Sequence, residues 1–359
     1  MSRQAAIPIV FALSAAFLFG SAPPLSKLLL EGIEPISLAA LIYLGAGIGM
    51  TIYWGAGWMA GSRRRKMESP LTRSDLPWLA ASVLSGSVAA TIILMFSLRV
   101  TPATTASLLM SFEAVATTLI AIALFREPVG RKFWSALVLI VGGCIALSWE
   151  PGSLYGFSIG ALGVLAATVC WGLGNNVNRV LSVKDPVGVV VLKGWSAGLI
   201  MLALAIGAGE PAPAVPAAMA AMVIGFVCFG GLMAICFLRA LRGLGAARAG
   251  SLFGTNPLFG VVISFAIFQD IPNMLFFAAV PLMVLGIWLL VTEEHRHSHT
   301  HLGQVHEHRH RHDDGHHDHT HPGTEPPIDR WGYHSHPHAH EAHTHEHPHH
   351  PDIHHRHEH

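Results

Sequence analysis

The chain has 359 residues, of which 52% are hydrophobic and 12% are charged, and its mean hydropathy is +0.47. Soluble domains carry about 25% charged residues, so this composition excludes an ordinary soluble protein and indicates an integral membrane protein. The net charge of zero is the sum of two oppositely charged parts. Residues 1–294 carry 17 basic and 12 acidic residues, whereas residues 295–359 carry 5 basic and 10 acidic residues. All 25 histidines lie in the second part. Two chemically different parts are therefore joined near Thr292.

Ten apolar segments are each long enough to cross a bilayer as a helix, which takes about 20 mostly apolar residues. In chain order they are 6–30, 36–58, 76–98, 104–125, 133–149, 158–180, 187–208, 217–240, 246–268 and 274–292. Lipid offers no hydrogen-bond partner to open backbone groups. The sequence therefore predicts an all-α integral membrane protein with ten transmembrane helices.

Basic residues fall almost entirely in alternate connections between these segments. The connection 61–75 contains five of them, and the connections near 126–132, 179–184 and 239–248 are also basic. The remaining connections contain one basic residue, Arg99. Because cytoplasmic loops are enriched in Lys and Arg, we expect a multi-pass protein of the inner (cytoplasmic) membrane of a bacterium, with both termini in the cytoplasm.

The second half of the apolar part repeats the first. "LRVTPATTASLLMSFEAVATTLIAIALFREP" (98–128) matches "LRGLGAARAGSLFGTNPLFGVVISFAIFQDIP" (241–272) at an offset of 143. "FGSAPPLSK" (19–27) matches "WGLGNNVNR" (171–179) at an offset of 152. Each half thus contributes five helices with the same internal order.

An odd number of helices in each half forces the second half to enter the membrane from the opposite side. The sequence therefore predicts two inverted five-helix repeats, 1–150 and 151–294, followed by a disordered cytoplasmic tail, 295–359. Inverted repeats are the architecture of many secondary transporters, in which the substrate site lies near the bilayer midplane between the repeats.

These features resemble the EamA family of the drug/metabolite transporter superfamily. The likeness rests on an aromatic–glycine pair early in each half (Phe19-Gly20 and Trp171-Gly172), an acid at the end of each fourth helix (Glu127 and Asp270), and a glycine-bearing fifth helix. It covers about residues 5–291. Ala114 departs from the family, which often has Pro after Glu, whereas Pro257 is kept. The resemblance implies a ten-helix basket that moves small metabolites without ATP, and it implies no single substrate.

Other function classes find little support in the sequence. No nucleotide-binding P-loop is visible, so ATP-driven transport by this chain alone is not expected. The apolar part shows no nucleophile–base pair, so we expect no enzyme activity. We expect the partners to be a small-molecule substrate, the lipid bilayer and divalent metal ions, with no nucleic acid and no required cofactor.

Two charged residues lie deep within apolar segments, where charges are costly and usually functional. Glu113 is ten residues into the fourth segment, and Lys193 is about seven residues into the seventh. A carboxylate in a low-dielectric site takes up a proton readily, which suits proton coupling or recognition of a cationic group. Lys193 would bind an anionic group or pair with Glu113, and the alternative is that either residue is structural.

Several polar or aromatic residues accompany these charges at matching places in the two halves. The candidates for substrate binding or coupling are Glu113, Lys193, Asn175, Asn176, Asn178, Asn256 and Trp171. Asn256 aligns with Glu113 and precedes Pro257, which loosens a helix. The asparagines either line a cavity or form hydrogen bonds between helices, and Trp171 either caps a pocket or packs in the bundle.

The tail repeats the pattern His-x-His, which brings several imidazoles within reach of one metal ion. The candidate metal ligands are His334, His336, His338, His340, His343, His345, His347, His349 and His350. Neutral imidazole suits Zn²⁺, Ni²⁺, Co²⁺ or Cu²⁺. Since histidine titrates near pH 6.5, a role in sensing pH is the alternative, because full protonation would change the tail charge from −5 to +20.

Three functions follow from these two parts. The first is a secondary transporter of a small organic metabolite with a metal-binding regulatory or buffering tail. The second is a transporter of a divalent metal or a metal chelate, against which the apolar part argues because it contains no histidine. The third is a non-transporting membrane protein that senses or stores metal.

Overall fold

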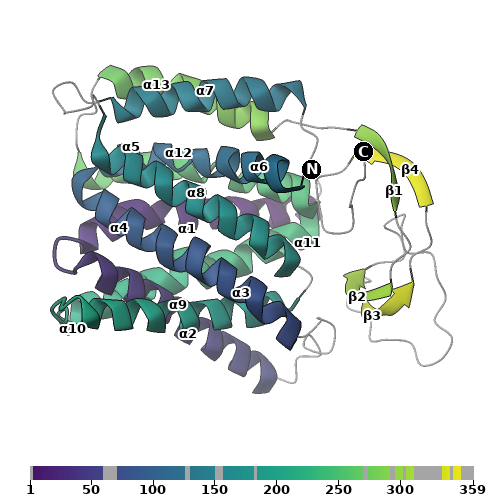
Figure 1. Cartoon of the computed structure of the whole chain (residues 1–359), viewed down its shortest axis with the longest axis horizontal. Helices are drawn as coiled ribbons and strands as arrows, with labels where there is room; N and C mark the ends of the chain where they lie inside the picture. The colour runs from purple at the N-terminus through teal and green to yellow at the C-terminus, as the bar shows by residue number, and fades with distance from the viewer. Residues whose placement is uncertain are drawn as a thin grey trace.

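The computed structural model describes residues 3–59, 71–125, 130–149, 157–181, 184–269, 274–291, 296–301, 305–310, 334–339 and 343–348. Apart from four short strands in the tail, the described elements are helices that lie side by side in a bundle (Figure 1). Eight of the described helical stretches are long and apolar enough to cross a membrane, and two shorter apolar helices accompany them. The prediction of an all-α membrane fold with ten apolar stretches is thus confirmed.

The first half of the bundle contains two undivided long helices, two divided stretches and a final helix. They are α1 (Arg3–Leu29); α2 (Pro35–Met59); the stretch of η2 (Arg73–Asp75), α3 (Leu76–Ser82), η3 (Val83–Ala89) and α4 (Ala90–Val100); α5 (Ala103–Leu109) with α6 (Phe112–Phe125); and α7 (Arg131–Ser148).

The second half follows the same order. Its elements are α8 (Ile159–Leu181), α9 (Pro186–Gly207), α10 (Val215–Ile224), η4 (Gly225–Gly230), α11 (Leu232–Phe253), α12 (Asn256–Phe268) and α13 (Met274–Val291). One boundary differs from the sequence prediction, because α11 stays helical through residues 241–245, where a connection was expected. This segment reads Leu-Arg-Gly-Leu-Gly, and its two glycines disfavour a helix by about 1 kcal/mol each relative to Ala, so packing rather than local propensity keeps it helical.

The two halves are interrupted at equivalent places. A π-helical turn divides α3 from α4 at Val83–Ala89, and another divides α10 from α11 at Gly225–Gly230. The offset of 143 maps the first turn onto 226–232, so the turns coincide to within about a residue at their starts. The fourth stretch of each half is also broken, between α5 and α6 and between α11 and α12. The π-helical turns were not predicted from the sequence.

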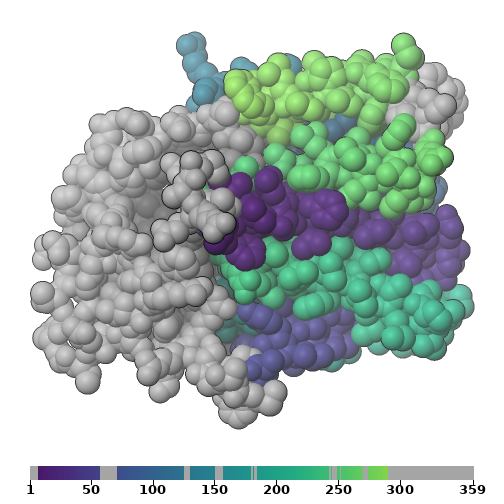
Figure 2. All heavy atoms as spheres, turned by 180° about the vertical axis from the view of Figure 1, so that it is seen from behind, coloured from purple at the N-terminus to yellow at the C-terminus, as the bar shows by residue number. Residues whose placement is uncertain are grey.

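Contacts between the two halves are also related by the offset of 143. A Cβ atom added at Gly143 would meet Met283, and one added at Gly286 would meet Ile140. The offset of 143 converts each of these contacts into the other, so α7 and α13 pack across an internal twofold relation. Helix α1 packs against α11 and α12, just as α8 packs against α4 and α6. In Figure 2, α1 (purple) runs between green segments of the second half.

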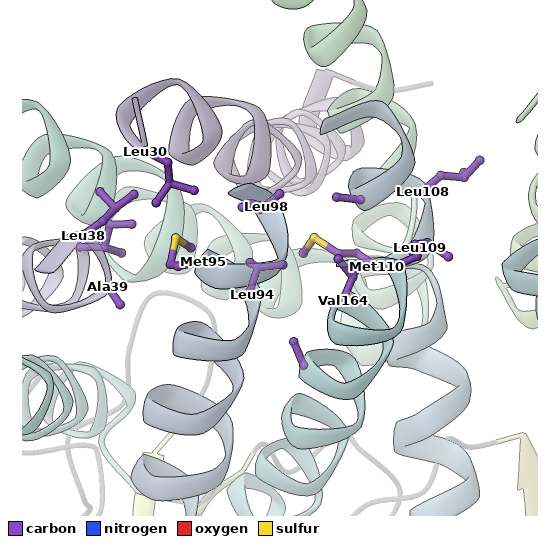
Figure 3. Close-up of a cluster of buried hydrophobic side chains, with 14 of the residues drawn as sticks. Leu30, Leu38, Ala39, Leu94, Met95, Leu98, Leu108, Leu109, Met110 and Val164 are labelled. Atoms are coloured by element: carbon purple, nitrogen blue, oxygen red, sulfur yellow. The ribbon is translucent and has the colours of Figure 1, made fainter. Parts of the chain in front are cut away.

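Large apolar side chains fill the centre of the bundle. Leu94, Met95 and Leu98 of α4 are fully buried against residues of α2 and α8, including Leu38 and Val164 (Figure 3). Lipid is as apolar as these side chains, so helix association in a membrane depends on close packing rather than on removal from water. The core therefore fixes the positions of α2, α4 and α8 relative to one another, and α8 carries the three asparagines described below.

The described parts of the tail form two antiparallel ribbons. Strand β1 (Arg296–His301) pairs with β4 (His343–Pro348), and β2 (Val305–His310) pairs with β3 (His334–Ala339). Figure 1 shows them beyond the end of the bundle at which α1 begins. The composition predicted a tail without a packed fold, and two-stranded ribbons of this length add no hydrophobic core of their own.

Candidate functional site

Glu113 lies at the break in the fourth apolar stretch. Helix α5 ends at Leu109 and α6 begins at Phe112, which makes Glu113 the second residue of α6. Its carboxylate Oε1 accepts a hydrogen bond of 2.9 Å from Asn175 Nδ2, which also lies 3.3 Å from Thr117 Oγ1. The unpaired N–H groups at a helix start favour negative charge nearby. The break in the stretch thus places a carboxylate beside a helix N-terminus in the middle of a membrane segment.

Asn175 lies on the side of α8 that otherwise packs against protein. The exposed apolar residues Ile159, Leu162, Val169 and Leu173 follow one stripe along α8. Asn175 is two residues beyond Leu173, about 200° around the helix, and therefore lies nearly opposite that stripe. Asn175 is nevertheless exposed. Its position opposite that stripe, together with its bonds to α6, indicates that its side chain faces protein rather than lipid.

Lys193 of α9 has two polar partners from other helices. Its Nζ donates to Ser82 Oγ at 2.8 Å and to Asn178 Oδ1 at 3.2 Å. Ser82 Oγ in turn donates to Asn178 Oδ1 at 2.6 Å. Ser82 is the last residue of α3, directly before the π-helical turn. The sequence analysis missed Ser82, because serine in an apolar helix carries no signal until its neighbours are known.

Helix α8 connects the two charged residues without joining them directly. Asn175 and Asn178 are three residues apart, which is about 4.5 Å along the helix axis. Asn175 contacts Glu113, and Asn178 contacts Lys193, but no ion pair between Glu113 and Lys193 occurs among the described residues. We call this group the central polar cluster, and its members are Ser82, Glu113, Thr117, Asn175, Asn178 and Lys193.

The other predicted site residues lie apart from the central polar cluster or serve packing. Asn176 is buried, and its Nδ2 donates to the backbone oxygens of Thr117 (3.0 Å) and Gly172 (2.8 Å), so it fastens α8 to α6. Trp171 is half-buried and packs against the hydrophobic core. Asn256 Nδ2 donates to the oxygen of Phe253, three residues earlier.

Polar contacts at the helix ends hold the bundle together away from the centre. The Glu210 carboxylate accepts from Ile36 N (3.1 Å), Ser37 N (2.7 Å) and Ser37 Oγ (2.7 Å), and thereby caps α2. Asp75 pairs with Lys184 at 3.1 Å. These contacts tie the start of α2 and the start of α3 to segments of the second half.

The predicted metal ligands fall in the tail. His334, His336 and His338 belong to β3, and His343, His345 and His347 belong to β4. His340, His349 and His350 lie outside the described residues, as do Glu127 and Asp270 of the repeat comparison. Strands β1 and β2, which pair with β4 and β3, contain further histidines that the sequence analysis did not name as ligands.

Comparison with known proteins matches both halves of the bundle to one family. The pattern of the EamA-like transporter family matches residues 6–149 and again residues 158–292. An uncharacterized transporter of Methanothermobacter thermautotrophicus is 27% identical over 297 residues, which cover 77% of this chain and 84% of the relative. A protein of known crystal structure matches with a TM-score of 0.56 and 18% identity, over 79% of this chain and 94% of the other, and this likeness concerns the fold alone.

Proposed function

The chain belongs to the EamA-like transporter family, and on this basis we propose that it is a secondary transporter that moves a small organic metabolite across the membrane without ATP. A membrane transporter is what the family and the relative in Methanothermobacter thermautotrophicus both support. The substrate class is our inference from the central polar cluster. Its place between helices of both halves suits the substrate site of an inverted-repeat transporter.

The observation that carries the proposal is the environment of Glu113. Its hydrogen-bond partner is an uncharged amide, and among the described residues no Lys, Arg or His side chain pairs with it. An ionised carboxylate within a membrane needs a counter-charge. A proton or a cationic group of the substrate supplies that charge, and either makes Glu113 the coupling or recognition group. Lys193, held by Ser82 and Asn178, offers a positive charge less than one turn farther along the same face of α8.

Reconstituted vesicles test this function. Purified protein in liposomes is screened for uptake of labelled small metabolites, with and without an imposed proton gradient. Glu113→Gln keeps the acceptor oxygen for Asn175 but removes the charge. At about 4 Å and an effective dielectric constant near 20, that charge is worth about 4 kcal/mol, so we expect uptake to fall by roughly 100- to 1,000-fold.

Uptake that is equal in Glu113→Gln and the unaltered protein would remove Glu113 from the mechanism. No uptake of any organic substrate, combined with uptake of Zn²⁺ or Ni²⁺, would favour the alternative of a metal transporter. Glu31→Gln provides a matched control, because it removes the same charge at an exposed position outside the central polar cluster and should leave uptake unchanged.

The proposal also includes a function for the tail. We assign to residues 295–359 the binding of Zn²⁺, Ni²⁺, Co²⁺ or Cu²⁺, on the strength of their 25 histidines. The ribbons lie at the end of the bundle where α1 begins (Figure 1), which agrees with a cytoplasmic position for both termini in a bacterial inner membrane. Equilibrium dialysis of the purified protein against each metal tests this binding, and deletion of 295–359 must abolish it.

A further inference from the structure

The internal repeat gives each contact between the halves a counterpart with which it can be compared. Helices α2 and α9 both begin at a proline, Pro35 and Pro186, so positions in them correspond at an offset of 151. Helices α3 and α10 correspond at the offset of 143 that relates the two π-helical turns. The contact of α10 with α2 is therefore the counterpart of the contact of α3 with α9.

Helix α10 and the π-helical turn that follows it touch α2 through the backbone. A Cβ atom added at Gly225 would overlap the backbone oxygen of Ile42, and one added at Gly45 would overlap that of Met222. The Glu210 carboxylate, which precedes α10, also caps the start of α2. We call the line from Ile42 and Gly45 to Met222 and Gly225 the α2–α10 seam, and it is closed.

The equivalent seam between α3 and α9 is bridged by a long side chain instead. The positions that correspond to Gly225 and Ile42 are Ser82 and Lys193. Here the Lys193 ammonium donates to Ser82 Oγ at 2.8 Å. Helix α3 packs against α8, and it has no comparable contact with α9 among the described residues, whereas α10 packs against α2. The α3–α9 seam is thus wider than its counterpart.

The two seams face opposite ends of the bundle. Consecutive long helices run in opposite directions, so α3 and α9 begin at the end where α1 begins, which we call the tail end. At that end Lys184, shortly before α9, pairs with Asp75, directly before α3, at 3.1 Å. Figure 1 shows α10 at the end opposite the tail strands. The seam toward the tail end is therefore bridged by two lysine side chains, and the seam toward the other end is closed by backbone contact.

The wider seam leads to the central polar cluster. Ser82 and Lys193 share Asn178 of α8 as a hydrogen-bond partner. At the offset of 152, the counterpart of Asn178 is Ser26, whose hydroxyl is buried and has no hydrogen-bond partner among the described residues. The joint contact of α3, α8 and α9 thus has no equivalent in the other half of the molecule.

We propose that the α3–α9 seam is the opening through which substrate passes between the central polar cluster and the tail end, and that Lys193 is its latch. This inference rests on the transporter function proposed above. In the second state of the transport cycle the seams exchange, so that α3 closes on α9 and α10 separates from α2. Lys193 then leaves Ser82, because its side chain fills the space that a backbone contact requires.

Two pairs of introduced cysteines in vesicles test the proposal. Leu79→Cys with Ser196→Cys spans the α3–α9 seam, at positions equivalent to a backbone contact of the closed seam. Ala46→Cys with Gly230→Cys spans the closed seam, where a Cβ atom at Gly230 would lie 3.2 Å from that of Ala46. A disulfide needs Cβ atoms about 3.5–4.5 Å apart. Disulfides are located by mass spectrometry of peptides, so the four native cysteines stay in place.

We expect the pair across the closed seam to oxidise at once. The pair across the α3–α9 seam should oxidise roughly 10- to 1,000-fold more slowly, since it waits for a minor state. Each disulfide should stop uptake of the labelled metabolite, and a reductant should restore it. Adding Lys193→Ala to the slow pair should speed its oxidation about 10-fold or more, because a hydrogen bond to a charged group is lost. Lys132→Ala, at an exposed position of α7, is the matched control and should leave the rate unchanged.

Specific results would overturn each part of the inference. A pair across the α3–α9 seam that never oxidises, or that oxidises as fast as the other pair, would refute the exchange of seams. Equal rates with and without Lys193→Ala would refute the latch. Oxidation is measured without uptake, so a chain that takes up no organic metabolite would overturn the proposed function by a separate result.

Discussion

Gly20 and Gly172 allow a sharp test of the internal repeat, because they are equivalent in sequence but not in their surroundings. A Cβ atom at Gly20 would overlap the backbone oxygen of Asn256 and would lie 3.1 Å from Gly260 N. A Cβ atom at Gly172 would lie 3.0 Å from Thr117 N and 3.2 Å from the flexible Ile120 Cδ1. The first contact requires a backbone shift of α12, whereas the second requires adjustments of a few tenths of an ångström.

These contacts set the expected free energies. Overpacking that moves backbone costs about 1–3 kcal/mol, whereas Gly→Ala within a helix gains about 1 kcal/mol. Because the Cβ atom at Gly20 would overlap a backbone oxygen, we take the upper part of that cost, about 2–3 kcal/mol, so Gly20→Ala should be destabilising by about 1–2 kcal/mol net, and Gly172→Ala should be close to neutral. Gly142→Ala, where nothing lies within 4 Å of the new Cβ, should stabilise by up to about 1 kcal/mol.

Thermal unfolding of the purified proteins in detergent measures the relative stabilities of these three variants. A chain of 150–250 residues shifts its Tm by about 2–4 °C per kcal/mol and a longer chain by less, so Gly20→Ala should lower Tm by up to about 8 °C. Gly142→Ala should unfold at or above the temperature of the unaltered protein. A Gly20→Ala variant that is as stable as Gly172→Ala would refute the close contact between α1 and α12 and the reasoning built on it.

Three further predictions concern the polar contacts. Asn176→Leu removes two hydrogen bonds to backbone oxygens and should destabilise by about 1–2 kcal/mol in the same unfolding assay; unchanged stability would contradict its role as a fastening between helices. Asn175→Ala removes the donor to Glu113 and should reduce substrate uptake at least 10-fold with little change in Tm, so a large fall in Tm with normal uptake would count against the site. Glu210→Ala leaves two N–H groups of α2 uncapped and should cost about 1–3 kcal/mol, whereas the same change at exposed Glu31 should cost under about 0.5 kcal/mol.

The three asparagines of α8 show which contacts of the site could not be predicted from sequence. Their presence in an apolar helix indicated that they are not exposed to lipid, and this required only the local composition. Asn175, Asn176 and Asn178 are successively rotated by about 100° per residue around the helix. Each therefore meets a different neighbour, namely the Glu113 carboxylate, a backbone oxygen of α6, and Lys193. Sequence could not separate these roles, because they depend on which helix lies at each angle.

The sequence by itself determined the number of apolar stretches, the internal offset of 143 and the deep placement of Glu113 and Lys193, because hydropathy and repetition are properties of the chain. Only the tertiary structure decided that these two charges bind different partners, that Ser82 contacts Lys193 and Asn178, and that π-helical turns interrupt both halves. The same holds for the tail, where strand pairing, and not composition, joins β1 with β4 and β2 with β3. Contacts between residues far apart in sequence arise from packing and pairing, which no local pattern of residues specifies.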